Sequence, residues 1–256
     1  MAGDIFSADF IRPWRTDKEA RRARQRAETF VTTQLRKYER VLYVMGNHEH
    51  WGEFVEDSAV RLKLFLENYA PNTRLLDNEK EEIDGVVFMG TTLWANCGFG
   101  TAEEWLINNG MRDFSRIRTR HPPLSPHALH RESGHRAFQP SDAHRLHQQN
   151  KQWLLDSTPK DRPVVLITHH APSFKSGHGV EYNTAYLDDA YCGNLVDYLL
   201  EHPNIKLAVH GHTHHPEHYR IGETLVISNP RGYFPDEQIS RHFDPQAEDI
   251  ATEEIK

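Results

Sequence analysis

The stretch Ile205–His215, "IKLAVHGHTHH", joins a short, mostly apolar segment directly to a cluster of histidines. A buried strand that ends in polar residues is typical of an open α/β sheet, in which ligands bind beyond the carboxyl ends of the strands. His212 and His214 stand two residues apart and share one face of an extended segment. A metal site is therefore the hypothesis to test, against the alternatives of a polar surface loop or a processing tag.

Two further apolar runs end in the same way. Residues 40–52 read "RVLYVMGNHEHWG" and residues 163–170 read "PVVLITHH", while the chain itself begins with Gly3-Asp4. If the strands lie in one sheet, all four polar clusters meet at one rim. Aspartate, asparagine and neutral histidine are oxygen and imidazole donors, which suit Mn, Fe, Zn, Ni or Co better than a thiolate-seeking ion. A carboxylate can also bridge two ions about 3.5–4 Å apart that activate water for attack on phosphorus.

The order of elements predicts an α/β fold with one core. We expect helices over residues 16–38, 53–69, 142–155 and 188–201, with Thr16 and Glu19 as a capping box and Ser141 as a cap. A hairpin is predicted around Gly222-Glu223. Residues 98–140, rich in Pro, His, Arg and Ser, are interpreted as an insertion or lid, and residues 235–256 as an acidic tail.

Composition excludes several classes of protein. The formal net charge of −7 argues against a general nucleic-acid coat or an anionic-membrane binder. The chain has only two cysteines, no apolar run of about 18 residues and no signal-peptide pattern, so we expect a cytoplasmic protein without a membrane partner.

Four short motifs carry a family resemblance: "GD" at 3–4, "GNHE" at 46–49, "THHAP" at 168–172 and "GHTH" at 211–214. In this order they resemble the calcineurin-like metallophosphoesterase superfamily. The segments "TTLWAN" (91–96) and "ISNPRGY" (227–233) are similar to its small bacterial and phage-type branch. The resemblance implies an αββα sandwich, with two packed mixed sheets flanked by helices, over residues 1–234. It also implies hydrolysis of phosphomonoesters or phosphodiesters by a metal-activated hydroxide.

The resemblance implies a set of metal ligands, residue by residue. Asp4 matches the carboxylate that bridges two metals, and Asn47, His169 and His212 match further ligands of the second metal. His214 matches a ligand of the first metal. Within "THHAP", His169 is favoured over His170 because it occupies the family's ligand position. Divalent ions are expected, with Mn first and Fe, Zn, Ni or Co as alternatives.

One residue matches the family's catalytic position. His48 corresponds to the histidine that steadies or protonates the leaving oxygen. A neighbouring acid would tune such a histidine, and we expect Asp4 to be that acid. The partner would be a phosphoester substrate, with nucleic acid bound only as substrate.

The family pattern opens with an Asp-x-His motif before Gly-Asp, and this sequence has none. We therefore expect the first strand of the fold to be missing, as in a truncated reading frame, a misassigned start or a degenerate copy. The second metal would keep Asp4, Asn47, His169 and His212, whereas the first would keep Asp4 and His214. We expect one tightly held ion and weak hydrolysis.

Two alternative functions remain open. The first is a non-catalytic metal-binding relative that acts as a binding or scaffold protein. The second is a nucleic-acid module that uses the Arg- and His-rich segment 112–145, which the net charge disfavours.

Overall fold

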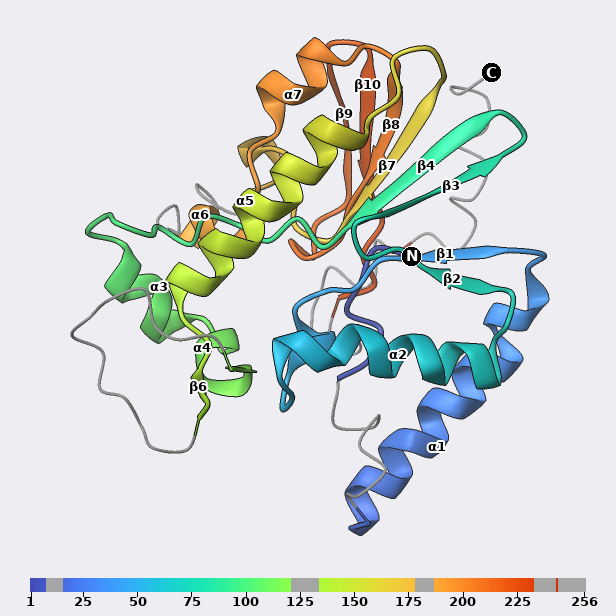
Figure 1. The fold of residues 1–256 in the computed structure, drawn as a ribbon, viewed down its shortest axis with the longest axis vertical. Coiled ribbons are helices and arrows are strands. Elements are labelled where there is room, and N and C mark those ends of the chain that lie inside the picture. The colour runs from blue at the N-terminus through green and yellow to red at the C-terminus, as the bar shows by residue number, and fades with distance from the viewer. Residues whose placement is uncertain (8–15, 121–133, 178–186, 233–242, 244–256) are drawn as a thin grey trace.

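Two sheets are stacked between two layers of helices in the computed structural model (Figure 1). The structure describes residues 1–7, 16–120, 134–177, 187–232 and 243. This arrangement is the expected αββα sandwich.

The larger sheet is mixed and has six strands in the spatial order β3-β4-β7-β8-β10-β9. Its strands are β3 (Glu79–Ile83), β4 (Val86–Thr91), β7 (Val164–Thr168), β8 (Ile205–Val209), β9 (Glu217–Ile221) and β10 (Thr224–Ser228). The four central strands are parallel, and β3 and β9 pair antiparallel at the two edges. The carboxyl ends of β7 and β8 therefore lie side by side.

The smaller sheet contains β1 (Val41–Tyr43) and β2 (Thr73–Leu75), paired in parallel. Ala2 forms a parallel bridge with Val44, which extends β1 toward the site. Separately, β5 (Arg118–Thr119) and β6 (Arg136–Ala137) make a short antiparallel pair.

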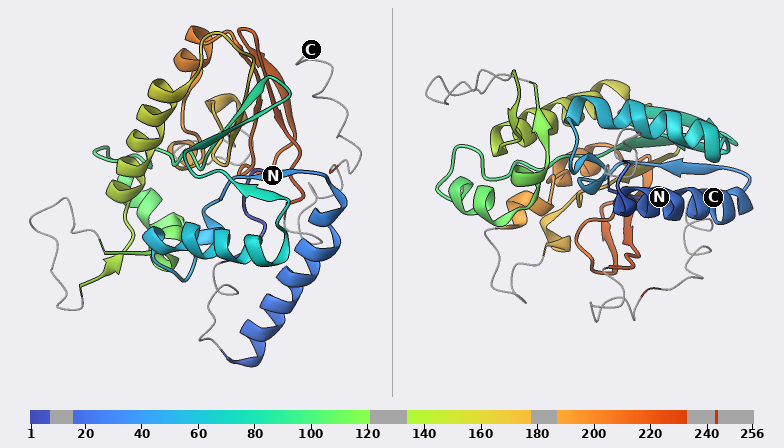
Figure 2. Two further views of the ribbon diagram at one scale, coloured as in Figure 1. Left: turned by 45° about the vertical axis from the view of Figure 1, so that its right-hand side comes forward. Right: turned by 90° about the horizontal axis from the view of Figure 1, so that it is seen from below.

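Helices cover the outer face of each sheet (Figures 1 and 2). The α-helices are α1 (Lys18–Thr33), α2 (Val55–Tyr69), α3 (Glu104–Gly110), α4 (Asp113–Arg116), α5 (Pro140–Ser157), α6 (Asp188–Tyr191) and α7 (Val196–Glu201). The described residues also include the short 3-10 helices η2 (Leu35–Lys37), η3 (His48–His50) and η4 (Phe174–Ser176). Helices α5 and α7 pack on the six-stranded sheet, and α1 and α2 pack beyond β1 and β2.

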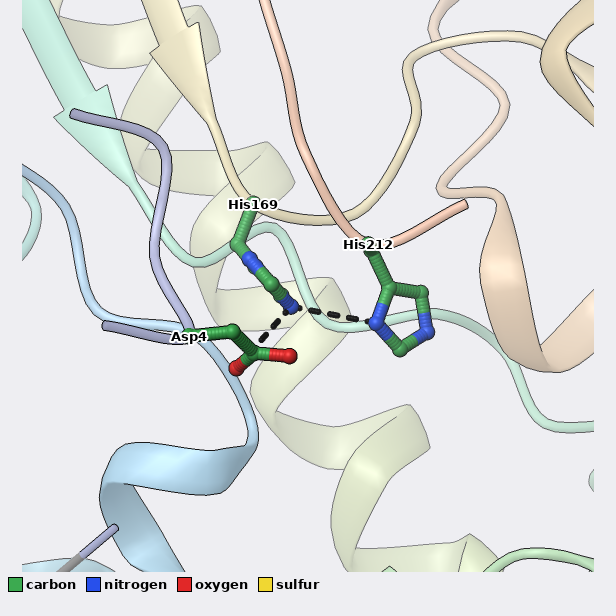
Figure 3. Close-up of side chains that lie close together, drawn as sticks. All are labelled: Asp4, His169 and His212. Atoms are coloured by element: carbon green, nitrogen blue, oxygen red, sulfur yellow. Dashed lines mark hydrogen bonds and ion pairs between the residues drawn. The ribbon is translucent and has the colours of Figure 1, made fainter. Parts of the chain in front are cut away.

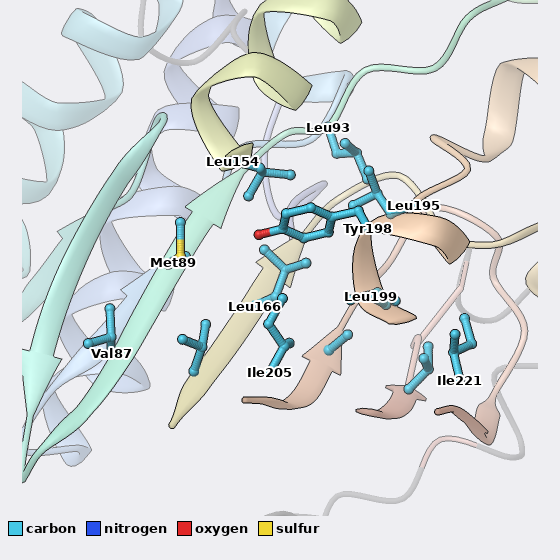
Figure 4. Packing of buried hydrophobic residues seen from close by; sticks show 13 residues of the cluster. Val87, Met89, Leu93, Leu154, Leu166, Leu195, Tyr198, Leu199, Ile205 and Ile221 are labelled. Atoms are coloured by element: carbon cyan, nitrogen blue, oxygen red, sulfur yellow. The ribbon is translucent and has the colours of Figure 1, made fainter. Parts of the chain in front are cut away.

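The strand β7 is buried on both faces because it lies between these layers. Val164 and Leu166 point into the cluster under α5 and α7, which Figure 4 shows. Val165 and Ile167, on the opposite face, join Val44 in the cluster between the two sheets. The alternation follows the two-residue period of a strand, and it explains why the "VVLIT" run is continuously apolar.

Local features differ from the sequence-based expectations at three places. Helix α1 is capped by Asp17, whose side chain accepts from the Ala20 amide, and not by Thr16. Helix α5 begins at Pro140, with Gln139 and Asp142 as its capping box, rather than at a Ser141 cap. The predicted helix 188–201 is two short helices, because the chain between them bonds to Ala171 and Pro172.

The predicted insertion 98–140 is described over residues 98–120 and 134–140, and residues 121–133 lie outside the described residues. It carries α3, α4, β5 and β6, and it has its own apolar cluster with Ile107, Phe114, Ile117 and Phe138. Of the predicted acidic tail, 235–256, only Phe243 lies within the described residues. No helix in the described ranges is long and apolar enough to cross a membrane.

Leu166→Ala should lower the free energy of unfolding by about 2–5 kcal/mol, because it leaves a cavity at a fully buried position of β7. Urea unfolding followed by circular dichroism measures the change. Leu155→Ala on α5, where the side chain is 52% exposed, is the matched control and should change stability far less. Equal losses for the two variants would contradict the placement of the core.

Candidate metal centre

Four of the predicted ligand side chains converge where the strand ends of the two sheets meet. Figure 3 shows Asp4, His169 and His212 directed toward one another. One ligand atom from each of these three lies within 4.8 Å of the others. The Asn47 Oδ1 atom joins them, at 2.9 Å from the Nε2 atom of His169. The residues come from the N-terminal segment and from the loops after β1, β7 and β8.

Several atoms with lone pairs lie close together at this point, and a positive charge between them would stabilise the arrangement. His169 Nδ1 donates to the Ala2 carbonyl at 2.7 Å, which leaves Nε2 as the atom that faces the cluster. Around Nε2 lie Asn47 Oδ1, His212 Nδ1 at 3.0 Å and Asp4 Oδ1 at 3.4 Å. Such a set is satisfied either by the proton of a charged His169 or by a metal cation. The chemistry of the donors therefore fits a divalent ion.

Glycines let the loops approach closely enough to form this cluster. A Cβ added at Gly46 would overlap the Asp4 carboxylate and lie 2.6 Å from a ring carbon of His169. At Gly211, it would lie 2.6 Å from the Ala2 carbonyl oxygen. Both positions require a residue without a side chain.

The buried carboxylate of Glu49 holds the N-terminal segment in the site. Its oxygens accept from the backbone amides of Asp4, Ile5, Phe6 and Gly46 at 2.7–3.0 Å. The Tyr43 hydroxyl donates to the same carboxylate at 2.7 Å. This ionic group thus ties the segment that carries Asp4 to the loop that carries Asn47.

Two of the converging residues have left-handed backbone conformations. Asp4 has φ 57° and His212 has φ 68°. Non-glycine residues seldom adopt these values, and each costs on the order of 1–3 kcal/mol. The surrounding hydrogen bonds of the loops offset this strain.

His48 lies at the edge of the cluster on η3. Its Nε2 is 3.7 Å from Asp4 Oδ2, and its backbone amide donates to Asp4 Oδ1 at 2.9 Å. The Trp51 ring stacks on the imidazole, with ring centroids 3.6 Å apart and planes inclined by 30°. The acid expected to tune His48 is therefore beside it.

Burial and mutual charge shift the titration of these groups in opposite directions. Burial lowers the pKa of His48 to about 4 and holds the pKa of His212 well below its usual value. Burial also acts to lower the pKa of His169, but the Asp4 carboxylate outweighs it and the net pKa is raised. Burial acts to raise the pKa of Asp4, yet His169 and His48 hold it below its ordinary value.

The other predicted ligand, His214, is not part of the three-residue cluster of ligand atoms. It is half-buried and lies near enough to His48 to affect the pKa of that residue. His170 is not one of the three clustered ligands, although its ring centroid lies 4.3 Å from that of His212; its Nδ1 lies 3.2 Å from the Thr92 carbonyl oxygen. The ligand and catalytic roles of all these residues stay predictions.

Two important residues were not singled out from the sequence. Glu49 belongs to the quoted "GNHE" motif, and that position could have drawn attention to it. Asp113 lies in the 98–140 segment and accepts from the Asn47 side chain at 2.8 Å. No sequence pattern marks Asp113, because the contact joins residues 66 positions apart.

Comparisons with known proteins give a family match and a shared fold. The family model described as calcineurin-like phosphoesterase matches residues 1–216. An uncharacterised protein, L509, of Acanthamoeba polyphaga mimivirus is 24% identical over 210 residues, covering 77% of this chain and 69% of that protein. The crystal structure of phosphopantetheinyl hydrolase (PptH) from Mycobacterium tuberculosis superposes with a TM-score of 0.55 and 16% identity. The match covers 83% of this chain and 75% of that one, and it shows a shared fold.

Four buried histidines should each cost the metal-free protein stability as the pH falls from about 6.5 toward about 4. Burial lowers the pKa of His50 and His170 to about 3 and the pKa of His147 and His210 to about 4. The unfolded chain therefore takes up protons first, and each group lowers the free energy of unfolding by at most about 1.4 kcal/mol per pH unit.

Urea unfolding at pH 7, 6 and 5 measures this slope. His147→Gln should reduce this slope by at most about 1.4 kcal/mol per pH unit, the contribution of one histidine. His147 is not one of the clustered ligands, and it bonds to the Trp94 carbonyl. His218→Gln on the exposed side of β9 is the matched control. A His147→Gln protein with the same slope as the wild-type protein would contradict the assignment.

Proposed function

The chain belongs to the calcineurin-like phosphoesterase family, and on that premise we propose that it is a metal-dependent hydrolase of phosphoesters. The observation that carries the proposal is the meeting of four donor atoms, from Asp4, Asn47, His169 and His212, around one point. A carboxylate, an amide oxygen and two imidazoles suit Mn²⁺ or another ion of the first transition series. A bound divalent ion would supply Lewis-acid activation of water and neutralisation of phosphate charge.

The residues of the chain have separate parts in this proposal. Asp4, Asn47, His169 and His212 would hold the ion, and His214 would serve a neighbouring ion that shares Asp4. His48, neutral near pH 7 because burial lowers its pKa to about 4, would donate a hydrogen bond to the leaving oxygen. Its stack against Trp51 and its contact with Asp4 would keep the ring in place for that role.

Substrates of both kinds, phosphomonoesters and phosphodiesters, belong in the proposal. The structure that shares the fold is described as a phosphopantetheinyl hydrolase, so phosphopantetheinyl compounds belong among the substrates to test here. We also propose a cytoplasmic location, which the free thiols of Cys97 and Cys192 support.

A second candidate function is a metal-stabilised binding protein without catalysis. His214 stands apart from the three-residue cluster. Among the described residues, three or more charged or imidazole donors therefore gather around one point only. A substrate screen with and without added Mn²⁺ separates the two functions, because only the enzyme would show metal-dependent turnover.

His48→Ala should lower kcat for a chromogenic phosphodiester by about 10²–10⁴-fold in the presence of Mn²⁺, because it removes the group that assists the leaving oxygen. Steady-state kinetics measure the loss, and elemental analysis measures the metal content of the same preparation. The metal content should stay close to that of the wild-type protein.

His144→Ala is a suitable control, because this histidine lies on α5, bonds to Asn96 and is not one of the clustered ligands. If His48→Ala loses its metal along with its activity, His48 is a ligand and the role proposed for it is wrong. If the wild-type protein with Mn²⁺ turns over no phosphoester in a broad screen, the binding-protein alternative is favoured.

A further inference from the structure

Helix α4 brings a buried carboxylate from the 98–140 segment to the metal centre. Asp113 is the first residue of this helix and is only 4% exposed. It belongs to no motif of the family resemblance. Its side chain nevertheless contacts a predicted ligand and a residue stacked on the predicted catalytic histidine.

A single oxygen of Asp113 makes both contacts. The Asn47 Nδ2 atom donates to Asp113 Oδ1 at 2.8 Å, and the Trp51 Nε1 atom donates to the same oxygen at 2.6 Å. An ionised carboxylate oxygen offers more than one lone pair and has no proton to donate, so it accepts both bonds at once. The three residues therefore form one connected unit.

The contact with Asn47 decides which end of the amide faces the metal centre. An asparagine side chain has an oxygen and an NH₂ group of similar size, and only the oxygen can bind a cation. If the amide were turned over, its oxygen would lie against the Asp113 oxygen, two acceptors with no proton between them. Asp113 thus holds Nδ2 on its own side and directs Oδ1 toward Nε2 of His169, 2.9 Å away.

The contact with Trp51 reaches the predicted catalytic residue. The Trp51 ring lies against His48 at a centroid separation of 3.6 Å, and the Arg116 guanidinium lies 4.9 Å from the ring centroid of Trp51. Fixing the indole N–H therefore fixes the surface on which the imidazole rests.

We infer that Asp113 is a positioning residue, which orients the Asn47 amide toward the metal and holds Trp51 beneath His48. The inference rests on the proposed metal centre. The described part of the 98–140 segment would then help to form the site. Its Asp113 would position Asn47 and Trp51 and would not itself bind the ion.

Calorimetric titration of the metal-free full chain with Mn²⁺ tests the first part. Asp113→Ala removes the acceptor and should weaken Mn²⁺ binding by about 10–100-fold, the usual effect of losing a partner of a metal ligand. Asp113→Asn keeps an oxygen that can accept both bonds and should restore most of the affinity. Asp161→Ala, whose side chain is 80% exposed, is the matched control and should bind like the wild-type protein.

Trp51→Phe separates the two contacts. It removes the indole donor but leaves the Asn47 contact in place, so Mn²⁺ affinity should remain near the wild-type value while kcat falls. A folded Asp113→Ala protein with wild-type affinity would overturn the inference. So would a Trp51→Phe protein that loses affinity as much as Asp113→Ala does. Absence of Mn²⁺ binding in the wild-type protein would instead reject the metal centre itself.

A second measurement applies if Asp113→Ala does not fold. In the ¹⁵N-labelled wild-type protein, the Asn47 side-chain amide should exchange slowly with water, because Nδ2 is buried and donates to Asp113. Asn47→Ala identifies this signal, and the exposed Asn108 amide on α3 is the reference. Exchange as fast as that of Asn108 would overturn the inference.

Discussion

The buried carboxylate of Glu49 is the interaction on which the arrangement of the site depends. It accepts four backbone amides and the Tyr43 hydroxyl, and so fixes the N-terminal segment against the loop after β1. A charged group buried in this way is costly unless every lone pair finds a donor. The donors here are mostly backbone amides, which have no alternative partner. These hydrogen bonds fix the backbone of the segment, and they therefore hold Asp4 in its left-handed conformation with its carboxylate beside His169.

The rim of the sheet was predictable because its chemistry is local in the sequence. Each apolar run stops at a polar cluster, and the parallel order of β7 and β8 then brings His169 and His212 together. The same reasoning predicted the hairpin at Gly222-Glu223, which is confirmed. In the first case the information is an apolar run that stops at polar residues, and in the second it is the Gly-Glu turn between two strand-forming segments.

Other features were not predictable because they depend on what each segment contacts in the fold and not on its own residues. The edge strand β3, "EKEEI", is almost without apolar residues, and it forms because β4 offers its free edge across the Asp84-Gly85 turn. The break in the predicted helix 188–201 depends on bonds to Ala171 and Pro172. Asp113 gives no signal at all in the sequence, since its importance depends entirely on which side chains α4 meets.

The hydrogen bond from His169 to the Ala2 carbonyl joins residues 167 positions apart, and this separation has a consequence for how the molecule folds. Contacts between such distant residues form late, because the entropy of closing a long loop must be overcome first. No fragment that ends before β8 can assemble the cluster. An ion that binds there would bind only the finished native state, and by mass action it would raise the stability of the whole domain rather than of one loop. Metal uptake would therefore follow the last steps of folding, and it would distinguish completed chains from partly folded ones.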